Sequence, residues 1–482
     1  MSTQITLIPA LTALAFMIGS STLLARTWTD AKSGKTLEAE LVGLKDGKVT
    51  LKFKDGKTFE LELDRLIADD KAFAEKEAAT KPLGGATDWP TWRGTARDGK
   101  SPDTGLLKEW PNGGPKLLWT YENAGKGYSS PALVDGKIYL TGSRGGKAEV
   151  ICLDSSGKEL WSAPIGADPG SGYNTGWGGG TRGAPTVSDG MVFAMSANGA
   201  LASFNAKDGK PLWSKDLVKD LGGKIPGWGY SESPLVDGDK IVVTPGGALG
   251  AIAAFDKKTG KELWRSKDLK DDAQYASLII ATVKGKRQYI QLFMNTLAGV
   301  DAENGDVIWK SAWPEGRTAV IPTPVYHDGS VYMTSGYGSG CKLVKIDGDK
   351  AEDVWENKVM KNHHGGVVLV EGHIYGFSDG GGLVCQEFAT GKQKWNKRDE
   401  GSQKGSVHYA DGMLYCMDED AGSVFLAEAN PDKYTELGRF EIPRQTKLRE
   451  GTNGKIWAHP VVIGGKLYLR DQDLFFCYDV KR

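Results

Sequence analysis

The sequence predicts an all-β protein in which one large β-propeller follows a small β-barrel. The main observation is a phrase that recurs along the chain: an apolar strand ending in an acidic residue, a turn with Gly-Lys, and then a Trp. The clearest copy is Asp256–Trp264. The copies end 40 to 52 residues apart, at Trp161, Trp213, Trp264, Trp309, Trp355 and Trp395. A repeat of this length is typical of four-stranded units that bury their faces by stacking radially.

A second series of signals sets the number of blades. Short segments, each expected to be an innermost strand, end at turns of the Asp-Gly type, which favour two-residue hairpins. Eight such turns follow one another, which predicts eight blades: Asp135-Gly136, Asp189-Gly190, Asp237-Gly238, Lys284-Gly285, Asp328-Gly329, Glu371-Gly372, Asp411-Gly412 and Gly464-Gly465. The eighth blade has its third strand at Phe475–Asp479, after which the sequence ends. Residues 115–121 are expected to supply its outermost strand, so that N- and C-terminal strands close the ring without an open edge.

The residues before the propeller divide into three parts. Residues 5–25 carry no charge and precede Arg26, which predicts a signal peptide over 1–25, with an uncleaved membrane anchor as the alternative. Residues 26–76 contain three stretches of apolar-polar alternation and then a short helix from Asp69, which predicts a small β-barrel. Residues 77–87 form a charged and then glycine-rich linker, and the propeller is expected over 88–482.

Composition narrows the function classes. The chain has 60 Lys and Arg against 61 Asp and Glu, so no global field attracts nucleic acid. None of the five cysteines are adjacent, and three share one position of the repeat, which predicts buried core thiols. The predicted signal places the chain in the periplasm, the cell envelope or the medium, with no transmembrane span after cleavage.

Two resemblances add to this prediction. Residues 26–30, 43–49 and 63–66 resemble the SHD (SLA homology) domain, an SH3-like β-barrel, which implies a small interaction module. The repeat phrase and the opening Trp-Pro-Thr-Trp-Arg-Gly (89–94) resemble the PQQ-like eight-bladed β-propeller family over 88–482. That family includes quinoprotein dehydrogenases and the propeller lipoprotein of the outer-membrane-protein assembly machinery. The resemblance implies the fold, with each repeat Trp packing between blades.

The candidate site lies where the loops that lead into the innermost strands converge on the central channel. Counting seven residues back from each turn aligns these leading loops and places aromatic and cationic side chains at one mouth. Two glycine-rich loops, 173–183 and 227–230, lie at the same mouth. The candidate ligand-binding residues are Tyr128, Trp177, Arg182, Trp228, Tyr230, Glu232, His364, Lys404, Trp457 and His459.

Three functional hypotheses follow. The leading one is an exported non-catalytic scaffold that binds an unknown protein, peptide or glycan, with no catalytic residue and no cofactor expected; aromatic loops suit such ligands. The second is a PQQ-dependent oxidoreductase that uses Ca²⁺, with Trp177, Arg182 and Trp457 as pieces of the site. An adjacent Cys pair and a haem motif are missing, and Glu232 alone offers Ca²⁺ a carboxylate. The third is metal or carbohydrate binding at the channel mouth, with His363, His364 and His459 as the candidate metal ligands.

Overall fold

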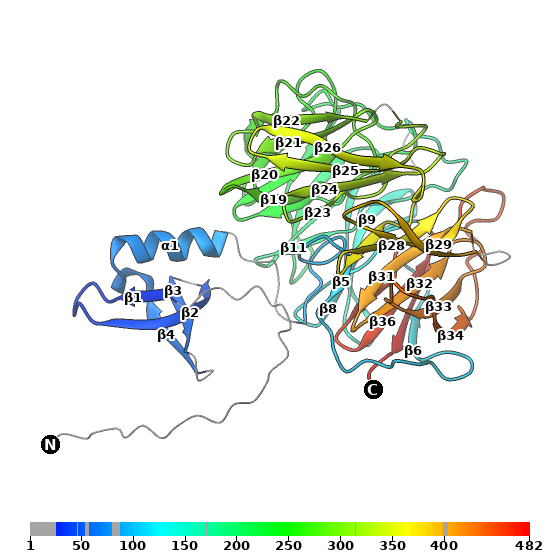
Figure 1. The fold of residues 1–482 in the computed structure, drawn as a ribbon, viewed down its shortest axis with the longest axis horizontal. Helices are drawn as coiled ribbons and strands as arrows, with labels where there is room; N and C mark the ends of the chain where they lie inside the picture. The colour runs from blue at the N-terminus through cyan, green and yellow to red at the C-terminus, as the bar shows by residue number, and fades with distance from the viewer. Residues whose placement is uncertain are drawn as a thin grey trace. The chain divides into compact units, whose positions relative to one another are not determined.

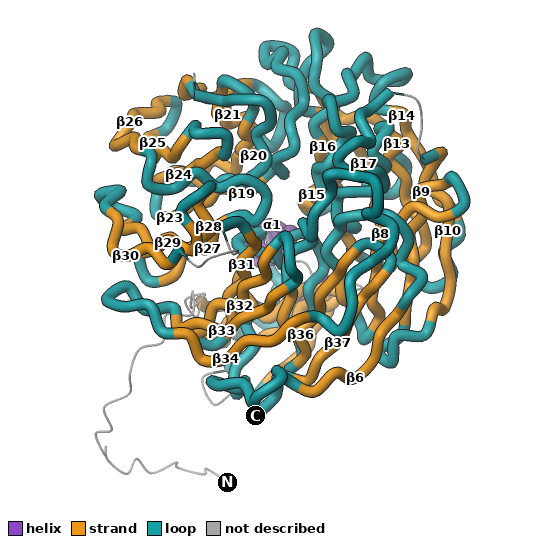
Figure 2. The backbone as a smooth tube through the Cα atoms, turned by 90° about the vertical axis from the view of Figure 1, so that its right-hand side faces the viewer, coloured by secondary structure: helices purple, strands orange, loops and turns teal. Residues whose placement is uncertain are grey.

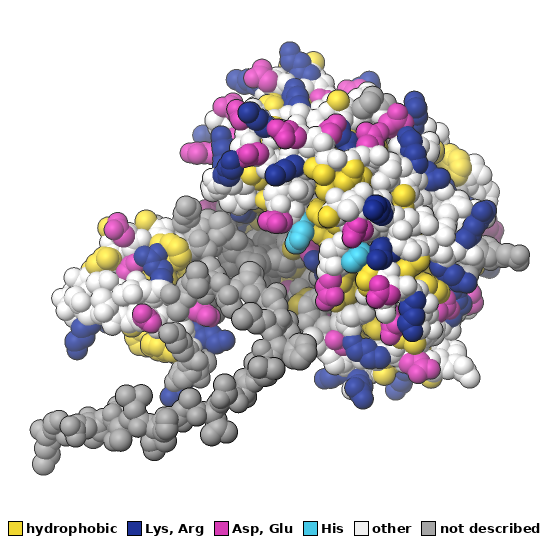
Figure 3. Space-filling view, in the orientation of Figure 1, with side chains coloured by type: hydrophobic (Ala, Val, Ile, Leu, Met, Phe, Trp, Pro, Cys, Tyr) yellow, Lys and Arg dark blue, Asp and Glu magenta, His cyan; other side chains and the backbone are white. Residues whose placement is uncertain are grey.

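The computed structural model describes residues 26–45, 47–53, 57–79, 87–168, 172–313, 315–398 and 403–482. The chain divides into two compact units between Lys81 and Pro82. The predicted signal peptide and most of the predicted linker lie outside the described residues. Within the described ranges, no helix combines the length and apolarity needed to cross a membrane. Side chains of both charge signs are mixed over the face drawn in Figure 3, as the balanced composition predicts.

The first unit is a small antiparallel sheet with one helix (Figure 1). Trp28, Val49 and Leu51 are fully buried at its centre, and the Trp28 indole donates to the carbonyl of Ala39 at 2.9 Å. The buried Asp70 at the start of the helix accepts from the Thr29 amide at 2.7 Å. The elements in order are β1 (Arg26–Thr29), β2 (Thr36–Lys45), β3 (Lys48–Lys52), β4 (Thr58–Glu62), the 3-10 turn η1 (Leu63–Arg65) and α1 (Ala68–Ala79).

The second unit is a ring of eight sheets, which confirms the eight-bladed propeller (Figure 2). The first four blades, written from the channel outward, are β7 (Ala132–Val134), β8 (Lys137–Arg144), β9 (Lys147–Leu153) and β10 (Glu159–Ala167); β11 (Thr186–Ser188), β12 (Met191–Met195), β13 (Ala200–Asn205) and β14 (Pro211–Asp216); β15 (Leu235–Asp237), β16 (Lys240–Val243), β17 (Ala253–Asp256) and β18 (Glu262–Arg265); β19 (Ile279–Val283), β20 (Lys286–Leu292), β21 (Thr296–Asp301) and β22 (Val307–Ala312).

The other four blades complete the ring. They are β23 (Val325–His327), β24 (Ser330–Ser335), β25 (Gly340–Asp347) and β26 (Lys350–Asn357); β27 (Val367–Val370), β28 (His373–Ser378), β29 (Gly382–Glu387) and β30 (Gln393–Lys397); β31 (Gly405–Ala410), β32 (Met413–Asp418), β33 (Ser423–Glu428) and β34 (Glu436–Glu441), with β5 (Lys100–Ser101) beside β31; β35 (Val461–Ile463), β36 (Lys466–Asp471), β37 (Leu474–Asp479) and β6 (Lys116–Tyr121).

The eighth blade joins distant parts of the chain. Strand β6 is its outermost strand and pairs antiparallel with β37, from Phe475 opposite Tyr121 to Asp479 opposite Lys116. The segment 115–121 therefore supplies the outermost strand of the eighth blade, as predicted. Because strands from both ends of the propeller pair in this one sheet, β37 has no open edge and the ring is closed.

The repeat Trp residues pack between blades. The Trp213 indole donates to the Lys257 carbonyl of the next blade at 2.8 Å, and a Cβ on Gly260 would lie 2.8 Å from its ring. Trp309 is different, because its indole donates to Gln288 of its own blade at 2.7 Å. The next blade joins β25 and β26 by the tight pairing of Asp347 with Lys350, so the usual Thr-Gly-Lys turn that would receive this Trp is missing.

A segment at the start of the propeller, residues 88–101, lies along the innermost strands; we call it the central segment. Trp89 exchanges two backbone hydrogen bonds with Leu133 of the first blade, at 2.7 and 2.8 Å. Thr91 hydrogen-bonds Thr186 of the second blade at 2.8 Å. At its other end, Lys100 and Ser101 pair with the innermost strand of the seventh blade.

Two arginines tie the central segment to the blades between these points. Arg97 donates at 2.9 and 2.7 Å to the carbonyls of Ser233 and Pro234, before the third blade, and at 2.7 Å to that of Leu278, before the fourth. Arg93 donates to the carbonyl of Val367 in the sixth blade. Both arginines have positive φ, 60° and 55°, a conformation that costs free energy unless the surroundings impose it. The central segment is thus bonded to the inner strands or leading loops of the first to fourth, sixth and seventh blades.

Candidate functional site

A cavity of about 450 Å³ opens where the leading loops converge, with Trp92 and Arg93 of the central segment among its lining residues. Trp92 donates from its indole to Thr323 of the fifth blade at 2.9 Å, and its ring lies 4.6 Å from that of His459. A volume of this size is in the range of small-molecule sites. Of the side chains predicted for this mouth, the following line the cavity: Tyr128, Trp177, Arg182, Trp228, His363, His364, Lys404, Trp457 and His459.

Tyr230 and Glu232 do not line the cavity, which corrects two predicted positions. Tyr230 is 1% exposed in the core and donates to the Pro245 carbonyl at 2.8 Å. Glu232 is also buried and accepts from the amide and hydroxyl of Thr244 at 2.7 and 3.1 Å.

The physical reason is a one-residue slip in the third blade. Asp237 is still part of β15, where it pairs with Lys240, so the turn is Gly238-Asp239 and begins one residue later than expected. In an extended chain, a slip of one residue reverses the direction of every side chain. Ser231 and Ser233 accordingly line the cavity in place of Tyr230 and Glu232.

One wall of the cavity is a continuous row of aromatic rings. The ring of Tyr337 lies 4.3 Å from that of His363, which lies 3.7 Å from that of His364. The His364 ring stacks on Trp457 at 4.3 Å with an interplanar angle of 19°, and Trp457 lies 5.0 Å from Tyr128. Tyr337 and Trp177 are each more than 40% exposed, so the apolar surface continues onto the rim.

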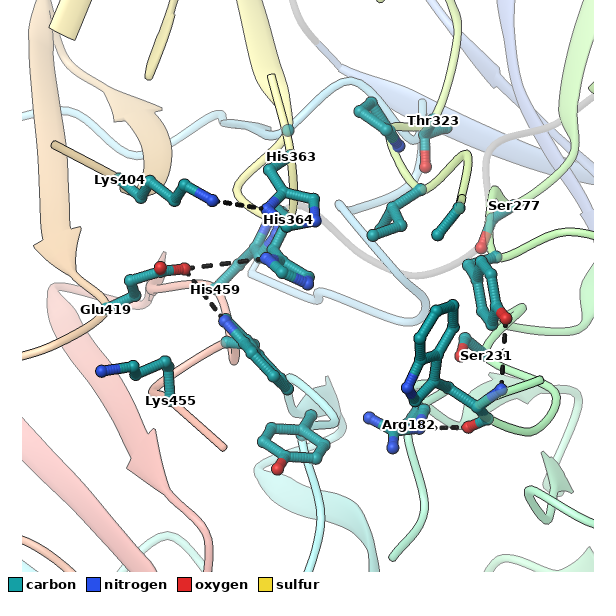
Figure 4. Close-up of a pocket in the computed structure, with 18 of the residues that line it drawn as sticks. Arg182, Ser231, Ser277, Thr323, His363, His364, Lys404, Glu419, Lys455 and His459 are labelled. Atoms are coloured by element: carbon teal, nitrogen blue, oxygen red, sulfur yellow. Dashed lines mark hydrogen bonds and ion pairs between the residues drawn. The ribbon is translucent and has the colours of Figure 1, made fainter. Parts of the chain in front are cut away.

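Charged groups hold this wall in place (Figure 4). Glu419 accepts from the Trp457 indole at 2.9 Å and lies 3.6 Å from Nδ1 of His364. Burial raises the pKa of Glu419, and it lowers the pKa of His364 well below its usual range, with Lys404 adding to the effect. Lys404 donates to Nδ1 of His363 at 2.9 Å, and burial, followed by the charges of His364 and Lys404, lowers the pKa of His363. Both imidazoles are therefore neutral at neutral pH.

The opposite wall is built around Arg182. Its Nε donates to the Trp228 carbonyl at 2.8 Å and its Nη2 to the Gly178 carbonyl at 2.9 Å. The guanidinium carbon lies 4.9 Å from the centre of the Tyr128 ring, within the range of a cation–π contact. Trp228 packs against Tyr275, with ring centres 5.9 Å apart. Figure 4 shows Arg182 and Ser231 on one side of the cavity, and Glu419, Lys404 and the two adjacent histidines on the other.

Several lining residues were not predicted as site residues from the sequence. Trp92 and Arg93 belong to the opening motif, whose only sequence signal is its likeness to a family. Glu419 stands in an acidic run, Asp418-Glu-Asp420, that indicates a solvated loop, yet it is 8% exposed. Tyr275 belongs to the fourth blade, whose segment before the turn is longer than in the other blades and is aligned from Ser277. Tyr275 lies two residues before that point.

The site offers little to a metal ion. In the described part of the chain, no group of three or more His, Cys, Asp or Glu side chains is placed to hold one. His459, one of the three weak candidates, instead donates from Nε2 to the carbonyl of His364 at 2.8 Å. All five cysteines are buried free thiols.

The residues also do not fit a quinone held through Ca²⁺. Among the described residues that line the cavity, Glu419 is the one carboxylate, and it already bonds Trp457. Ca²⁺ requires six to eight oxygen ligands, usually with several carboxylates. Glu232, the carboxylate that the sequence offered for this role, faces away.

Comparison with known proteins agrees with this architecture. Residues 111–222, 146–376 and 342–432 match the family described as "Outer membrane protein assembly factor BamB", and the chain belongs to this family of β-propellers. Residues 21–81 match SLA homology domain 1.

Individual relatives extend the match over most of the propeller. The outer membrane protein assembly factor BamB of Burkholderia pseudomallei is 27% identical over 395 residues, which cover 79% of this chain and 91% of that protein. The quinohemoprotein alcohol dehydrogenase ADH-IIG of Pseudomonas putida is 30% identical over 156 residues, 31% of this chain and 21% of that protein. The solved structure of BamB from Moraxella catarrhalis superimposes with a TM-score of 0.54 at 14% identity, over 76% of this chain and 99% of that one, and supports the fold.

Proposed function

We propose that the chain is a non-catalytic binding scaffold of the cell envelope, periplasmic or exported, whose propeller receives its ligand in the central cavity. The observation that carries the proposal is the construction of that cavity. The central segment contributes Trp92 and Arg93 to its lining, and hydrogen bonds fix Arg182, Trp457, Lys404 and His459 around it. A site whose side chains are already held in place loses little entropy on binding, which favours recognition.

The comparisons support a scaffold in a second way. The matched assembly factor of Burkholderia pseudomallei is similar over 91% of its length, whereas the matched quinohemoprotein is similar over 21% of its own. The SLA homology unit gives the chain a second module for interaction, and its partner is a protein or peptide in this proposal.

Ligand-induced stabilisation tests the proposal. The purified chain is heated with a panel of short peptides, saccharides, and PQQ with and without Ca²⁺, because a ligand that binds the folded state raises the melting temperature. We expect a saturable rise with at least one ligand, without turnover of that ligand. Trp457→Phe, which loses the indole bond to Glu419, is expected to weaken the rise, whereas Trp395→Phe on an outer strand leaves it intact.

Two outcomes would contradict the proposal. One is PQQ-dependent oxidation of an alcohol in a dye-linked assay, which would make the chain an oxidoreductase. The other is a melting temperature that no ligand class changes at concentrations far above any useful dissociation constant.

A further inference from the structure

We infer that the central cavity binds a carboxylated sugar, such as the uronic acid end of an acidic glycan, with the carboxylate at Arg182 and the sugar hydroxyls facing Glu419. This inference rests on the proposed function, since it names the ligand class of the same cavity. It follows from three features: a cation without an acidic partner, polar groups that suit hydroxyls, and a flat aromatic wall.

The charge of the cavity is unbalanced at Arg182. Its Nε and Nη2 donate to backbone carbonyls, and the guanidinium forms no ion pair with any described residue. Burial lowers the pKa of Arg182, yet the group remains charged at neutral pH. A bound carboxylate would give this guanidinium a charge-assisted hydrogen bond. Arg93 adds a second positive charge to the lining, although its Nε and Nη1 are buried.

The other cations at this mouth already have partners. Lys404 lies 3.5 Å from Asp379, and Lys455 forms an ion pair with Asp420. The attraction for an anion is therefore concentrated at Arg182. Glu419 lies across the cavity from Arg182 and would repel a second carboxylate (Figure 4). A ligand with one carboxylate fits this distribution better than a flat polycarboxylate.

The remaining polar groups suit hydroxyls. A carboxylate such as Glu419 accepts hydrogen bonds from ligand hydroxyls, and the hydroxyls of Ser231 and Ser277 face the same space. These groups bind neutral polar groups, so the ligand is expected to carry hydroxyls in addition to its carboxylate.

The aromatic wall supplies the surface for the ring of the sugar. His364 and Trp457 form a nearly parallel stack at 4.3 Å, and Trp228 stands on the opposite side of the cavity. Such rings present a flat apolar face beside polar groups, against which the C–H face of a pyranose ring can pack. A neutral apolar peptide would use the rings but would leave the Arg182 guanidinium without an anion.

Calorimetric titration of the purified chain with sodium D-glucuronate and D-glucose tests the inference, because the two sugars differ at one carbon. Charged hydrogen bonds are worth about a 10- to 100-fold change in affinity, so glucuronate should bind at least about tenfold more tightly than glucose. Arg182→Gln should remove most of this preference by lowering the affinity for glucuronate more than that for glucose. Arg182→Lys, which keeps the charge, should restore part of it.

Melting temperature and circular dichroism confirm that each variant is folded before it is titrated. Equal affinity for the two sugars, binding of neither sugar, or a glucuronate preference that persists in folded Arg182→Gln would overturn the inference. If peptides or planar aromatic acids bind in a Trp457-dependent manner and neither sugar does, the inference fails while the proposed scaffold stands. If no ligand class binds, both fail.

Discussion

Replacing Arg97 by Met removes the side chain through which the central segment holds the third and fourth blades. Arg97 is 5% exposed and donates to four acceptors: the carbonyls of Ser233, Pro234 and Leu278 and the hydroxyl of Thr91. Hydrogen bonds from a charged group contribute about 1.5–3 kcal/mol each. Desolvation of the guanidinium, which lowers its pKa to about 10, offsets much of that sum.

Removing one partner from a buried charged network typically costs about 3–5 kcal/mol, and we expect Arg97→Met to lie in this range. For residues 82–482, the entropy of unfolding is about 0.8 kcal/mol/K, so the melting temperature should fall by about 4–6 °C. Differential scanning calorimetry measures this shift directly.

Arg97→Lys is the matched control, because it keeps the charge but loses the planar fork that reaches several carbonyls at once. Its melting temperature should lie between those of the wild type and Arg97→Met. A melting temperature of Arg97→Met within 1 °C of the wild type would refute the reasoning, since the central segment would then contribute little to joining the blades.

Three further predictions concern the repeats, the ring and a buried histidine. Gly260→Ala should lower the melting temperature more than Gly285→Ala, because both glycines have positive φ but only at residue 260 would the new Cβ meet the Trp213 ring, at 2.8 Å; equal losses would count against packing between blades. Deleting residues 473–482 removes β37 and should abolish the cooperative unfolding transition, whereas an unchanged transition would show that ring closure is dispensable. Burial lowers the pKa of His408 to about 3, and its Nε2 accepts a backbone hydrogen bond. The folded state therefore binds fewer protons than the unfolded state, and this stability is present above pH 6.5 and lost below it. Between pH 6.5 and 5 the wild type should lose about 2 kcal/mol relative to His408→Gln, and parallel pH profiles would disprove this.

The fold could be predicted because its signals are local and repeated. Each blade carries its own turn and its own strand pattern, and the missing outermost strand of the eighth blade follows from counting strands. Trp309 departs from the pattern for an equally local reason, the shortened turn between Asp347 and Lys350.

The site could be predicted only where the count of residues from a turn was right. In the third blade, the turn begins one residue later than the Asp-Gly signal indicates, and Tyr230 and Glu232 lie in the core. Glu419 was missed because its burial depends on Trp457, which is 38 residues away in the sequence. The central segment carries no periodic signal, since its contacts reach blades up to about 300 residues away.

The measurement that we would make first is the structure of the chain crystallised with a short oligoglucuronate. The ligand is expected inside the central cavity, with one carboxylate against Arg182, one sugar ring on the stack of His364 and Trp457, and hydroxyls facing Glu419. A saturable ligand found on an outer strand or another loop, with the cavity filled by water alone, would contradict the assignment of this cavity as the binding site.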